Sequence, residues 1–195
     1  MIKKGIILAG GLGTRMSPLT KAVNKQLLPL YDKPLIYYPL SILMLANIKD
    51  ILIIVNKGQL NQFRKILPEK NNLGISIKYK EQAKPGGLPQ AFTIGKKFIG
   101  NDSVSLILGD NFFYGKNLEK ILRKNINLDS GVKIFIHPVK KPSLYGIATI
   151  DKNKKVINLV EKPKKTNSKF AVTGLYFFDN QVINLVKKLK PSKRG

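Results

Sequence analysis

The stretch that decides the fold is KGIILAGGLGTR, residues Lys4–Arg15. Its first half, Lys4–Ala9, is a short apolar run, and such runs are typical of a parallel strand buried on both faces. Its second half places three glycines, Gly10, Gly11 and Gly13, directly after that strand. Glycines allow the backbone to pass close to a ligand, and the exposed N–H groups can then form an anion-binding nest.

The residues after the glycines favour a phosphate ligand. Arg15 follows Thr14 and adds a forked cation, and Lys25 lies ten residues further on. The pattern is neither a Walker loop nor the dinucleotide motif G-x-G-x-x-G. The glycines alone would fit a plain turn as well as a phosphate loop, and the two cations shift the interpretation toward phosphate.

Working outward, strands and helices alternate along the chain. We predict further strands at Ile51–Val55, Ile75–Tyr79, Ser105–Leu108 and Lys133–His137, and helices at Leu35–Asn47, Gln59–Leu67, Pro89–Phe98 and Asn117–Ile126. This alternation indicates a mostly parallel sheet with helices on both faces, in which ligands bind beyond the carboxyl ends of the strands. From Gly146 the pattern becomes strand after strand, and it ends in a helix. Those last elements are expected at Gly146–Asp151, Val156–Val160, Ala171–Phe178 and Gln181–Leu189. We expect one α/β domain over residues 1–195, without internal repeats.

The composition excludes several classes of protein. Of the 195 residues, 43% are hydrophobic, which is enough for a real core. The absence of cysteine excludes disulfides and thiolate sites, and a single histidine, His137, excludes a His-rich metal site. We expect His137 to help local packing rather than act as a base. No apolar run approaches the ~20 residues of a membrane span, and the N-terminal run is too short for a signal peptide. We therefore expect a cytoplasmic protein that does not bind membranes.

The charge of +24 is the strongest compositional feature, and it suggests nucleic acid first. Only four of the 35 basic residues are arginine, the residue that reads guanine edges, and the lysines are scattered along the whole chain. Lysine, asparagine and isoleucine are all abundant and share A/T-rich codons. We interpret the charge as a solvated basic surface produced by mutational drift, with no specific nucleic-acid partner. Such a field would still attract nucleotides and sugar phosphates.

Longer motifs resemble the sugar-phosphate nucleotidylyltransferase family. Gly10–Ile54 contains G-G-x-G-T-R-x-x-P-L-T and a later K-x-L-x-P. The similarity continues through Leu108-Gly109-Asp110-Asn111, Tyr145-Gly146, Glu161-Lys162-Pro163 and Val172-Thr173-Gly174-Leu175-Tyr176. Lys25-Gln26-Leu27-Leu28-Pro29 favours the thymidylyl branch, the glucose-1-phosphate thymidylyltransferases. The resemblance implies a Rossmann-like, three-layer mixed sheet of the glycosyltransferase-A-type, nucleotide-diphospho-sugar transferase fold. It also implies conversion of dTTP and α-D-glucose 1-phosphate to dTDP-glucose and pyrophosphate, the first step of dTDP-L-rhamnose and polysaccharide biosynthesis.

The resemblance assigns roles residue by residue. It implies nucleotide binding by Gly10, Gly11, Gly13, Thr14, Arg15, Lys25, Gln26, Gln82, Gly87 and Asp110, with Gln82 and Gly87 reading the thymine. It implies sugar-phosphate binding by Asn111, Tyr145, Gly146, Glu161, Lys162 and Val172. Arg15, Lys25, Asp110 and Lys162 are the expected catalytic residues. Asp110 is also the expected ligand of Mg²⁺, which favours one or two carboxylates together with phosphate oxygens.

Plainer interpretations stand beside these roles. Arg15 and Lys25 could be surface charges near a turn, and Gln82 an ordinary solvent-facing residue. Asp110 could be a helix N-cap or a turn aspartate, and Glu161 and Lys162 a solvated pair before Pro163.

The family chain continues beyond the equivalent of Gly195, where it normally carries a second metal aspartate and helices tied to homo-oligomerisation. We therefore expect a C-terminally shortened core. The alternatives are an inactive nucleotide-sugar-binding remnant, a related uridylyltransferase and a basic nucleic-acid-binding protein.

Overall fold

The computed structural model describes residues 1–11 and 13–189, and the chain divides into two compact units. The larger unit consists of Met1–Lys133 and the segment from Phe177 on, and the smaller unit is Ile134–Tyr176. We describe each unit by itself.

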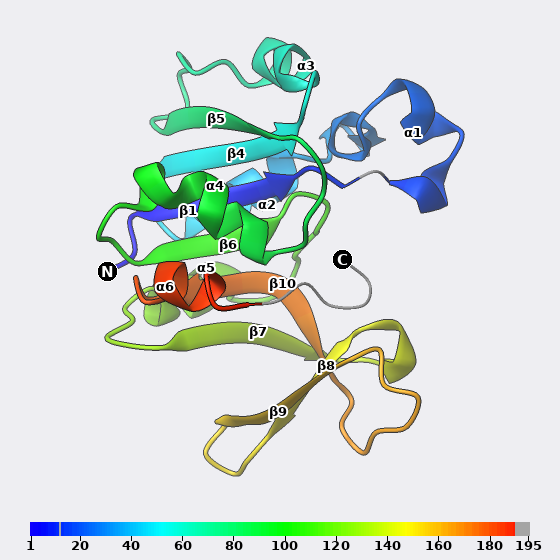
Figure 1. The fold of residues 1–195 in the computed structure, drawn as a ribbon, viewed down its shortest axis with the longest axis vertical. Coiled ribbons are helices and arrows are strands. Elements are labelled where there is room, and N and C mark those ends of the chain that lie inside the picture. Colours follow the sequence, from blue (N-terminus) through cyan, green and yellow to red (C-terminus); the bar gives the residue numbers. More distant parts are fainter. Residues whose placement is uncertain (12, 190–195) are drawn as a thin grey trace. The chain divides into compact units, whose positions relative to one another are not determined.

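The larger unit is built on parallel strands, as the alternating pattern predicts. β1 (Lys4–Ala9) lies between β4 (Asp50–Asn56) and β6 (Val104–Leu108), and β5 (Ser76–Gln82) pairs with the far side of β4. Ile51 to Val55 are completely buried, or nearly so, because both faces of the sheet are covered. Because the four strands are parallel, their carboxyl ends all lie along one edge of the sheet (Figure 1).

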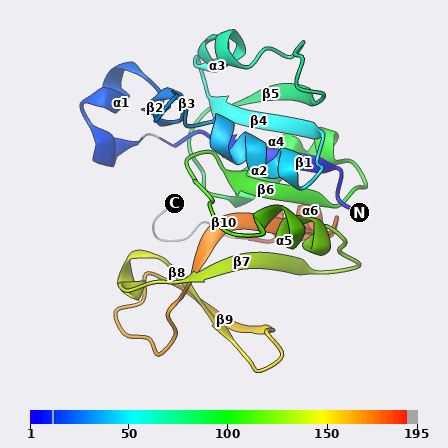
Figure 2. The same cartoon turned by 180° about the vertical axis from the view of Figure 1, so that it is seen from behind.

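Helices cover both faces of this sheet. α4 (Pro89–Ile99) packs with α6 (Val182–Val186) on the face seen in Figure 1, and α2 (Tyr37–Leu45) packs with α5 (Leu118–Asn125) on the face seen in Figure 2. The layers approach closely at two glycines. A Cβ atom on Gly5 would lie 2.8 Å from a methyl of Leu43 in α2, and one on Gly95 in α4 would lie 2.9 Å from a methyl of Ile6. The predicted three-layer arrangement is confirmed for this unit.

Short elements fill the segment between β1 and α2, and the sequence pattern did not reveal them. They are η1 (Thr14–Met16), α1 (Leu19–Ala22), η2 (Lys25–Leu27), β2 (Pro29–Leu30) and β3 (Lys33–Pro34). None exceeds four residues, so none shows a hydrophobic period. Together with α3 (Leu60–Ile66), the helix after β4, they complete the larger unit before β5.

The smaller unit is mostly antiparallel. β8 (Gly146–Ile150) and β9 (Val156–Glu161) form a hairpin, and β10 (Phe170–Phe178) pairs with the other edge of β8. The Asp151 carboxylate closes the hairpin turn by accepting the N–H groups of Asn153 and Lys155. β7 (Val132–Pro138) pairs with β10, and η3 (Pro142–Leu144) leads into β8. The predicted change of pattern at Gly146 is thus confirmed.

One difference in strand bounds bears on function. The sequence predicts the strand after α3 at Ile75–Tyr79, whereas β5 runs to Gln82. The strand continues because β4 supplies a partner for each further residue, the last pair being Asn56 and Gln82.

Within residues 1–11 and 13–189, no helix is long and apolar enough to cross a membrane.

Candidate functional site

The predicted nucleotide residues gather where the parallel strands end. Gly10 follows β1, Gln82 is the last residue of β5, and Asp110 comes two residues after β6. These strands belong to one sheet, in the order β5-β4-β1-β6, so loops far apart in the sequence meet at one edge of the sheet. This is the place where open α/β sheets bind ligands.

Side-chain amides hold the start of the glycine loop. Asn24 Nδ2 donates to the carbonyl of Ala9 (3.2 Å) and to Gln59 Oε1 (2.6 Å). Gln82 Nε2 donates to the carbonyl of Gly10 (3.0 Å). Two successive carbonyls of the loop are therefore fixed by buried amides, and this preorganises the backbone beyond them.

The glycines of this loop differ in what they require. A Cβ atom on Gly10 would lie 1.7 Å from Gln82 Nε2, so any other residue there would displace the Gln82 amide. Gly13 has φ 62°, in the left-handed region that glycine adopts without strain, and its carbonyl accepts a hydrogen bond from Thr20 Oγ1 (2.9 Å). Gly11 faces open space. The loop is thus tightly built at Gly10 and accessible at Gly11, as a backbone that receives a ligand needs to be.

Arg15 and Thr14 lie in η1 and are exposed. The Arg15 guanidinium makes no hydrogen bond or ion pair with the described part of the chain. Its forked donors are therefore free to bind an anion near the glycine loop.

Lys25 and Asp110 lie together. Lys25 Nζ is 2.7 Å from Asp110 Oδ2, and the two side chains are 24% and 32% exposed. Lys25 belongs to η2, and Asn24 caps that helix by accepting the backbone N–H of Gln26 (2.8 Å). If a nucleotide and a metal ion bind here, the lysine could leave the carboxylate and bind a phosphate, and the carboxylate could bind the metal ion.

Gln26 is more enclosed than a freely accessible ligand contact would be. The residue is 3% exposed, and its Oε1 is fully enclosed without a hydrogen-bond partner among the described residues. It packs against the turn at Gly109, where an added Cβ would lie 3.1 Å from Gln26 Cγ. An unpartnered buried amide oxygen costs stability, and such groups concentrate at functional sites.

The segment after β5 carries the other predicted base contact. Gly87 has φ 76°, which favours glycine, and Gly86 N donates to Gln90 Oε1 (2.9 Å). Pro89 takes the first position of α4, as its fixed φ predicts. Gln82 itself is 4% exposed rather than solvent-facing.

The predicted sugar-phosphate residues Tyr145, Gly146, Glu161, Lys162 and Val172 lie in the smaller unit. Gly146 and Glu161 are opposite each other in the β8–β9 ladder, and a Cβ on Gly146 would lie 3.0 Å from Glu161 Oε2. Lys162 has φ 45°, a strained value for a residue other than glycine, and its Nζ lies 3.7 Å from Glu161 Oε1. Asn111, the remaining member of the predicted set, follows Asp110 in the larger unit.

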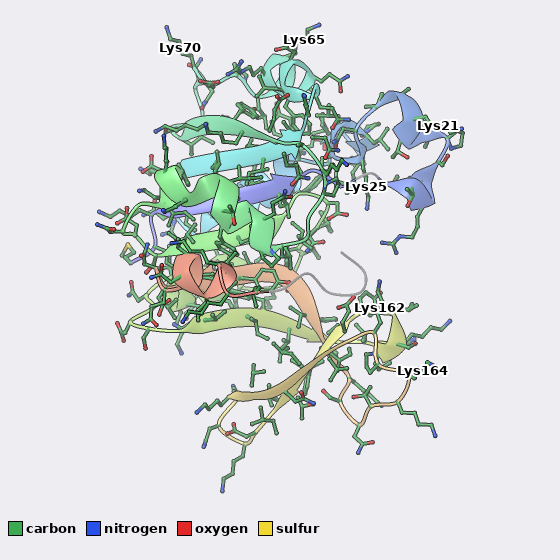
Figure 3. The ribbon with its side chains drawn as sticks, viewed as in Figure 1. Lys21, Lys25, Lys65, Lys70, Lys162 and Lys164 are labelled. Carbon is green, nitrogen blue, oxygen red and sulfur yellow. The ribbon has the colours of Figure 1, made fainter. Side chains whose placement is uncertain are left out.

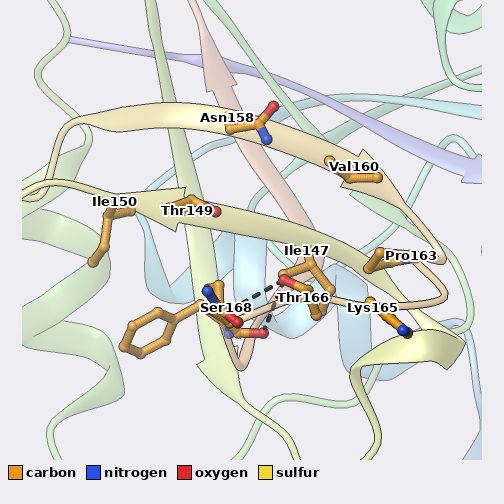
Figure 4. Close-up of a pocket in the computed structure, with 11 residues that line it drawn as sticks. Ile147, Thr149, Ile150, Asn158, Val160, Pro163, Lys165, Thr166 and Ser168 are labelled. Carbon is orange, nitrogen blue, oxygen red and sulfur yellow. Dashed lines mark hydrogen bonds between the residues drawn. The ribbon is translucent and has the colours of Figure 1, made fainter.

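A cavity of about 500 Å³ opens on the smaller unit (Figure 4). Its walls come from β8, β9 and the segment 163–170, and include Ile147, Thr149, Asn158 and Val160. Because side chains alternate along a strand, these four share one face of the hairpin, and Gly146 and Glu161 share the other. The cavity is therefore not the place that the predicted sugar contacts occupy.

Few carboxylates are available for a metal. Among residues 1–11 and 13–189 there is no group of three or more His, Asp or Glu side chains that could hold an ion. Asp110 is a partly exposed carboxylate at the strand edge, which suits a Mg²⁺ that takes most of its ligands from phosphates and water.

The lysines are not gathered on one element. Lys21 lies in α1, Lys65 in α3 and Lys70 in the loop after α3, and Figure 3 shows their side chains projecting outward. Lys25, by contrast, is engaged with Asp110.

Comparison with known proteins identifies the family. The sequence pattern of the nucleotidyl transferase family matches residues 4–195. The chain belongs to this family.

Curated relatives are similar over nearly the whole chain. Glucose-1-phosphate thymidylyltransferases of Neisseria meningitidis and Mycolicibacterium smegmatis are each 50% identical over 192 residues, 98% of this chain. The chain spans about two thirds of their length, 67% and 66%.

Solved structures agree on the fold. A Bacillus anthracis protein described as a glucose-1-phosphate thymidylyltransferase, in complex with sucrose, superposes with a TM-score of 0.89 at 41% identity, covering 98% of this chain and 77% of that one. A UDP-glucose pyrophosphorylase complexed with UDP-glucose gives a TM-score of 0.80 at 26% identity, covering 99% and 82%. The nucleotide-diphospho-sugar transferase fold expected from the sequence is thus confirmed.

Three residues of the site were missed by sequence reasoning. Asn24, Asn56 and Gln59 appear in no motif, yet each forms a side-chain hydrogen bond at the strand edge. The available signal was their position, because Asn56 ends an apolar strand and Asn24 directly precedes Lys25.

Proposed function

We propose that this chain catalyses thymidylyl transfer, in which dTTP and α-D-glucose 1-phosphate give dTDP-glucose and pyrophosphate, as the first step of deoxysugar synthesis. The observation that carries the proposal is the Lys25–Asp110 pair, with its 2.7 Å contact, beside a glycine loop fixed at Gly10 and open at Gly11. A nucleoside triphosphate with a divalent cation is the ligand that uses both members of such a pair. The thymidylyltransferases that are 50% identical to this chain support the choice of substrates.

The transfer requires positioning and charge neutralisation rather than a nucleophile on the protein. A phosphate oxygen of the sugar phosphate attacks the α-phosphorus in line, and the bond from that phosphorus to the pyrophosphate oxygen breaks. Negative charge then grows on the leaving pyrophosphate. Arg15 and Lys25 offset that charge, and preorganised cations are effective because they need no reorientation during the reaction.

The sugar phosphate is assigned to the smaller unit. Lys162 binds its phosphate, and Glu161 accepts hydrogen bonds from sugar hydroxyls. Gly146 allows close approach because it has no side chain, and a Cβ there would crowd Glu161. Tyr145 and Val172 of the same unit complete this part of the proposal, and Asn111 of the larger unit is also proposed to bind the sugar.

Asp110 is the proposed ligand of Mg²⁺. When bound, the ion neutralises phosphate charge and holds the triphosphate in a geometry suited to in-line attack. Lys25 contacts Asp110 in the structure. A carboxylate that bound the ion would leave this lysine for the phosphates.

A uridylyltransferase is the second candidate, favoured by the structural similarity to UDP-glucose pyrophosphorylase. Thymine and uracil differ by one methyl group, and a pocket separates such a pair by only ~1–3 kcal/mol. UTP should therefore be the second-best substrate.

The test is pyrophosphate release from dTTP, UTP, dCTP, ATP and GTP with glucose 1-phosphate and Mg²⁺, with the nucleotide sugar identified by mass. We expect dTTP to give the highest kcat/KM and UTP the next. Arg15→Ala should lower turnover by about 10²-fold, the usual effect of removing one preorganised group that stabilises developing charge.

Arg64→Ala is the matched control, because Arg64 carries the same charge but pairs with Glu69 at the surface (2.6 Å). Preference for ATP or GTP would refute the nucleotide assignment. Binding of dTTP without any release of pyrophosphate would identify the chain as a nucleotide-binding remnant instead.

A further inference from the structure

The Gln82 amide has only one possible orientation. Its nitrogen lies 3.0 Å from the carbonyl oxygen of Gly10, and a backbone carbonyl can only accept. The atom facing Gly10 must therefore be the NH₂ group.

Asn56 engages the same NH₂ group. Gln82 Nε2 lies 3.2 Å from Asn56 Oδ1, so both of its hydrogens are committed within the protein. Asn56 and Gln82 are the last pair of the β4–β5 ladder, which keeps the two side chains next to each other. Gly10 lies at the end of β1, on the other side of β4.

The remaining polar atom of Gln82 is its carbonyl oxygen. Gln82 Oε1 accepts no hydrogen bond from the described part of the chain. It is not among the fully enclosed unpartnered atoms, which in that part of the chain are Gln26 Oε1 and Ser105 Oγ. Gln82 therefore presents one acceptor, and no spare donor, at the edge where the nucleotide is proposed to bind.

We propose that Asn56 is a positioning residue for base specificity: with the Gly10 carbonyl, it holds Gln82 so that Oε1 accepts the N3–H group of a keto pyrimidine. The inference rests on the proposed function, because it assumes that Gln82 faces the base.

The chemistry separates the pyrimidines. Thymine and uracil carry a hydrogen at N3, and cytosine carries a lone pair there. An amide held with its oxygen outward attracts the first two and repels the third. The residue is only 4% exposed, so neither water nor rotation of the amide readily relieves the clash. Rotation would bring Oε1 against two acceptors, Gly10 O and Asn56 Oδ1.

This arrangement predicts a division of labour. The Gln82 amide excludes cytosine but treats thymine and uracil alike, since both present the same N3–H group. Selection for the methyl group must come from other contacts. Asn56 acts only through Gln82, so its removal should alter base preference more than general affinity for a triphosphate.

The experiment measures equilibrium dissociation constants for dTTP and dCTP with Mg²⁺, on the wild-type chain and three variants. The wild type should prefer dTTP by about 30-fold, the effect of one hydrogen bond gained against one clash. Asn56→Ala and Asn56→Leu both remove the acceptor, the second at similar volume, and each should lower that preference about 5-fold. Asn56→Asp keeps an acceptor oxygen and should retain the preference within about 2-fold.

The ratio of two nucleotides cancels effects common to both, such as the added charge of Asn56→Asp or a general loss of stability. An unchanged preference in folded Asn56→Ala and Asn56→Leu would refute the role of Asn56 while leaving the proposed function intact. A wild type that binds dTTP and dCTP equally well would instead refute the nucleotide assignment itself.

Discussion

Replacing Asp110 by asparagine should make nucleotide binding independent of the metal. In the wild type, a triphosphate that arrives without Mg²⁺ must separate Lys25 from Asp110 and then accept a carboxylate nearby. With Mg²⁺ the carboxylate binds the ion, and the lysine is free for phosphate. Asp110→Asn removes both the competing contact and the metal ligand. The variant should therefore bind metal-free dTTP more tightly than the wild type, and Mg²⁺ should add little.

The size of the effect follows from the geometry of the pair. Two charges 2.7 Å apart attract by roughly 1.5 kcal/mol in water and about 6 kcal/mol at an effective dielectric constant near 20. Both side chains are partly exposed, and the net value of such pairs is closer to ~1 kcal/mol once desolvation and side-chain ordering are counted. Metal-free dTTP should therefore bind Asp110→Asn about 5-fold more tightly, since each ~1.4 kcal/mol is a factor of ten.

The assay is isothermal titration of dTTP in EDTA and in Mg²⁺ at constant ionic strength. Asp102→Asn is the matched control, because Asp102 forms an ion pair of the same length with Lys4 (2.7 Å) at the amino end of β1. It changes the net charge equally but should leave both constants within about 2-fold of the wild type. Weaker binding by Asp110→Asn in EDTA, or a Mg²⁺ gain as large as in the wild type, would refute this account of the pair.

Two further predictions concern buried groups. Gln26→Met replaces an amide whose enclosed oxygen has no partner among the described residues, so thermal unfolding should show a stabilisation of about 1 kcal/mol while dTTP affinity falls; a lower Tm would contradict it. Burial, and secondarily Glu69, raises the pKa of the Tyr79 phenol above its usual range. The folded state thus favours the neutral phenol, and its contribution to stability is complete below about pH 10 and declines above it. Tyr79→Phe loses the hydrogen bond to the Leu67 carbonyl, so urea unfolding should show lower stability at neutral pH but a smaller decline toward pH 11; parallel pH profiles for the two proteins would contradict it.

The sequence predicted the parallel core well because its strands carry a strong pattern. Ile51–Val55 is an unbroken apolar run, and the observed strand extends it by one residue at each end. β1 has the predicted bounds because Gly10-Gly11 follows it directly. The segment 13–34 was missed as structure because its elements are held by individual hydrogen bonds, such as Thr20 Oγ1 to Gly13, rather than by a buried face.

The motifs located the site but could not show how its residues are connected. Arg15, Lys25 and Asp110 were found because charged residues near glycines stand out in a sequence. Their pairing was not predictable, since Lys25 and Asp110 are 85 residues apart and meet only when β1 and β6 lie side by side.

The uncharged amides were missed for a related reason. In the sequence, Asn56 cannot be told from an ordinary polar residue at the end of a strand. Only the register of β4 against β5 shows that it faces Gln82. From the sequence, we expected a glycine at position 10 because it lets the backbone pass close to a ligand. The structure gives a nearer cause, because the Gln82 amide already occupies the space that a side chain at position 10 would need. If Gln82 reads the base, residue 10 must stay glycine even where no ligand touches it, and the loop and the specificity of the site depend on the same contact.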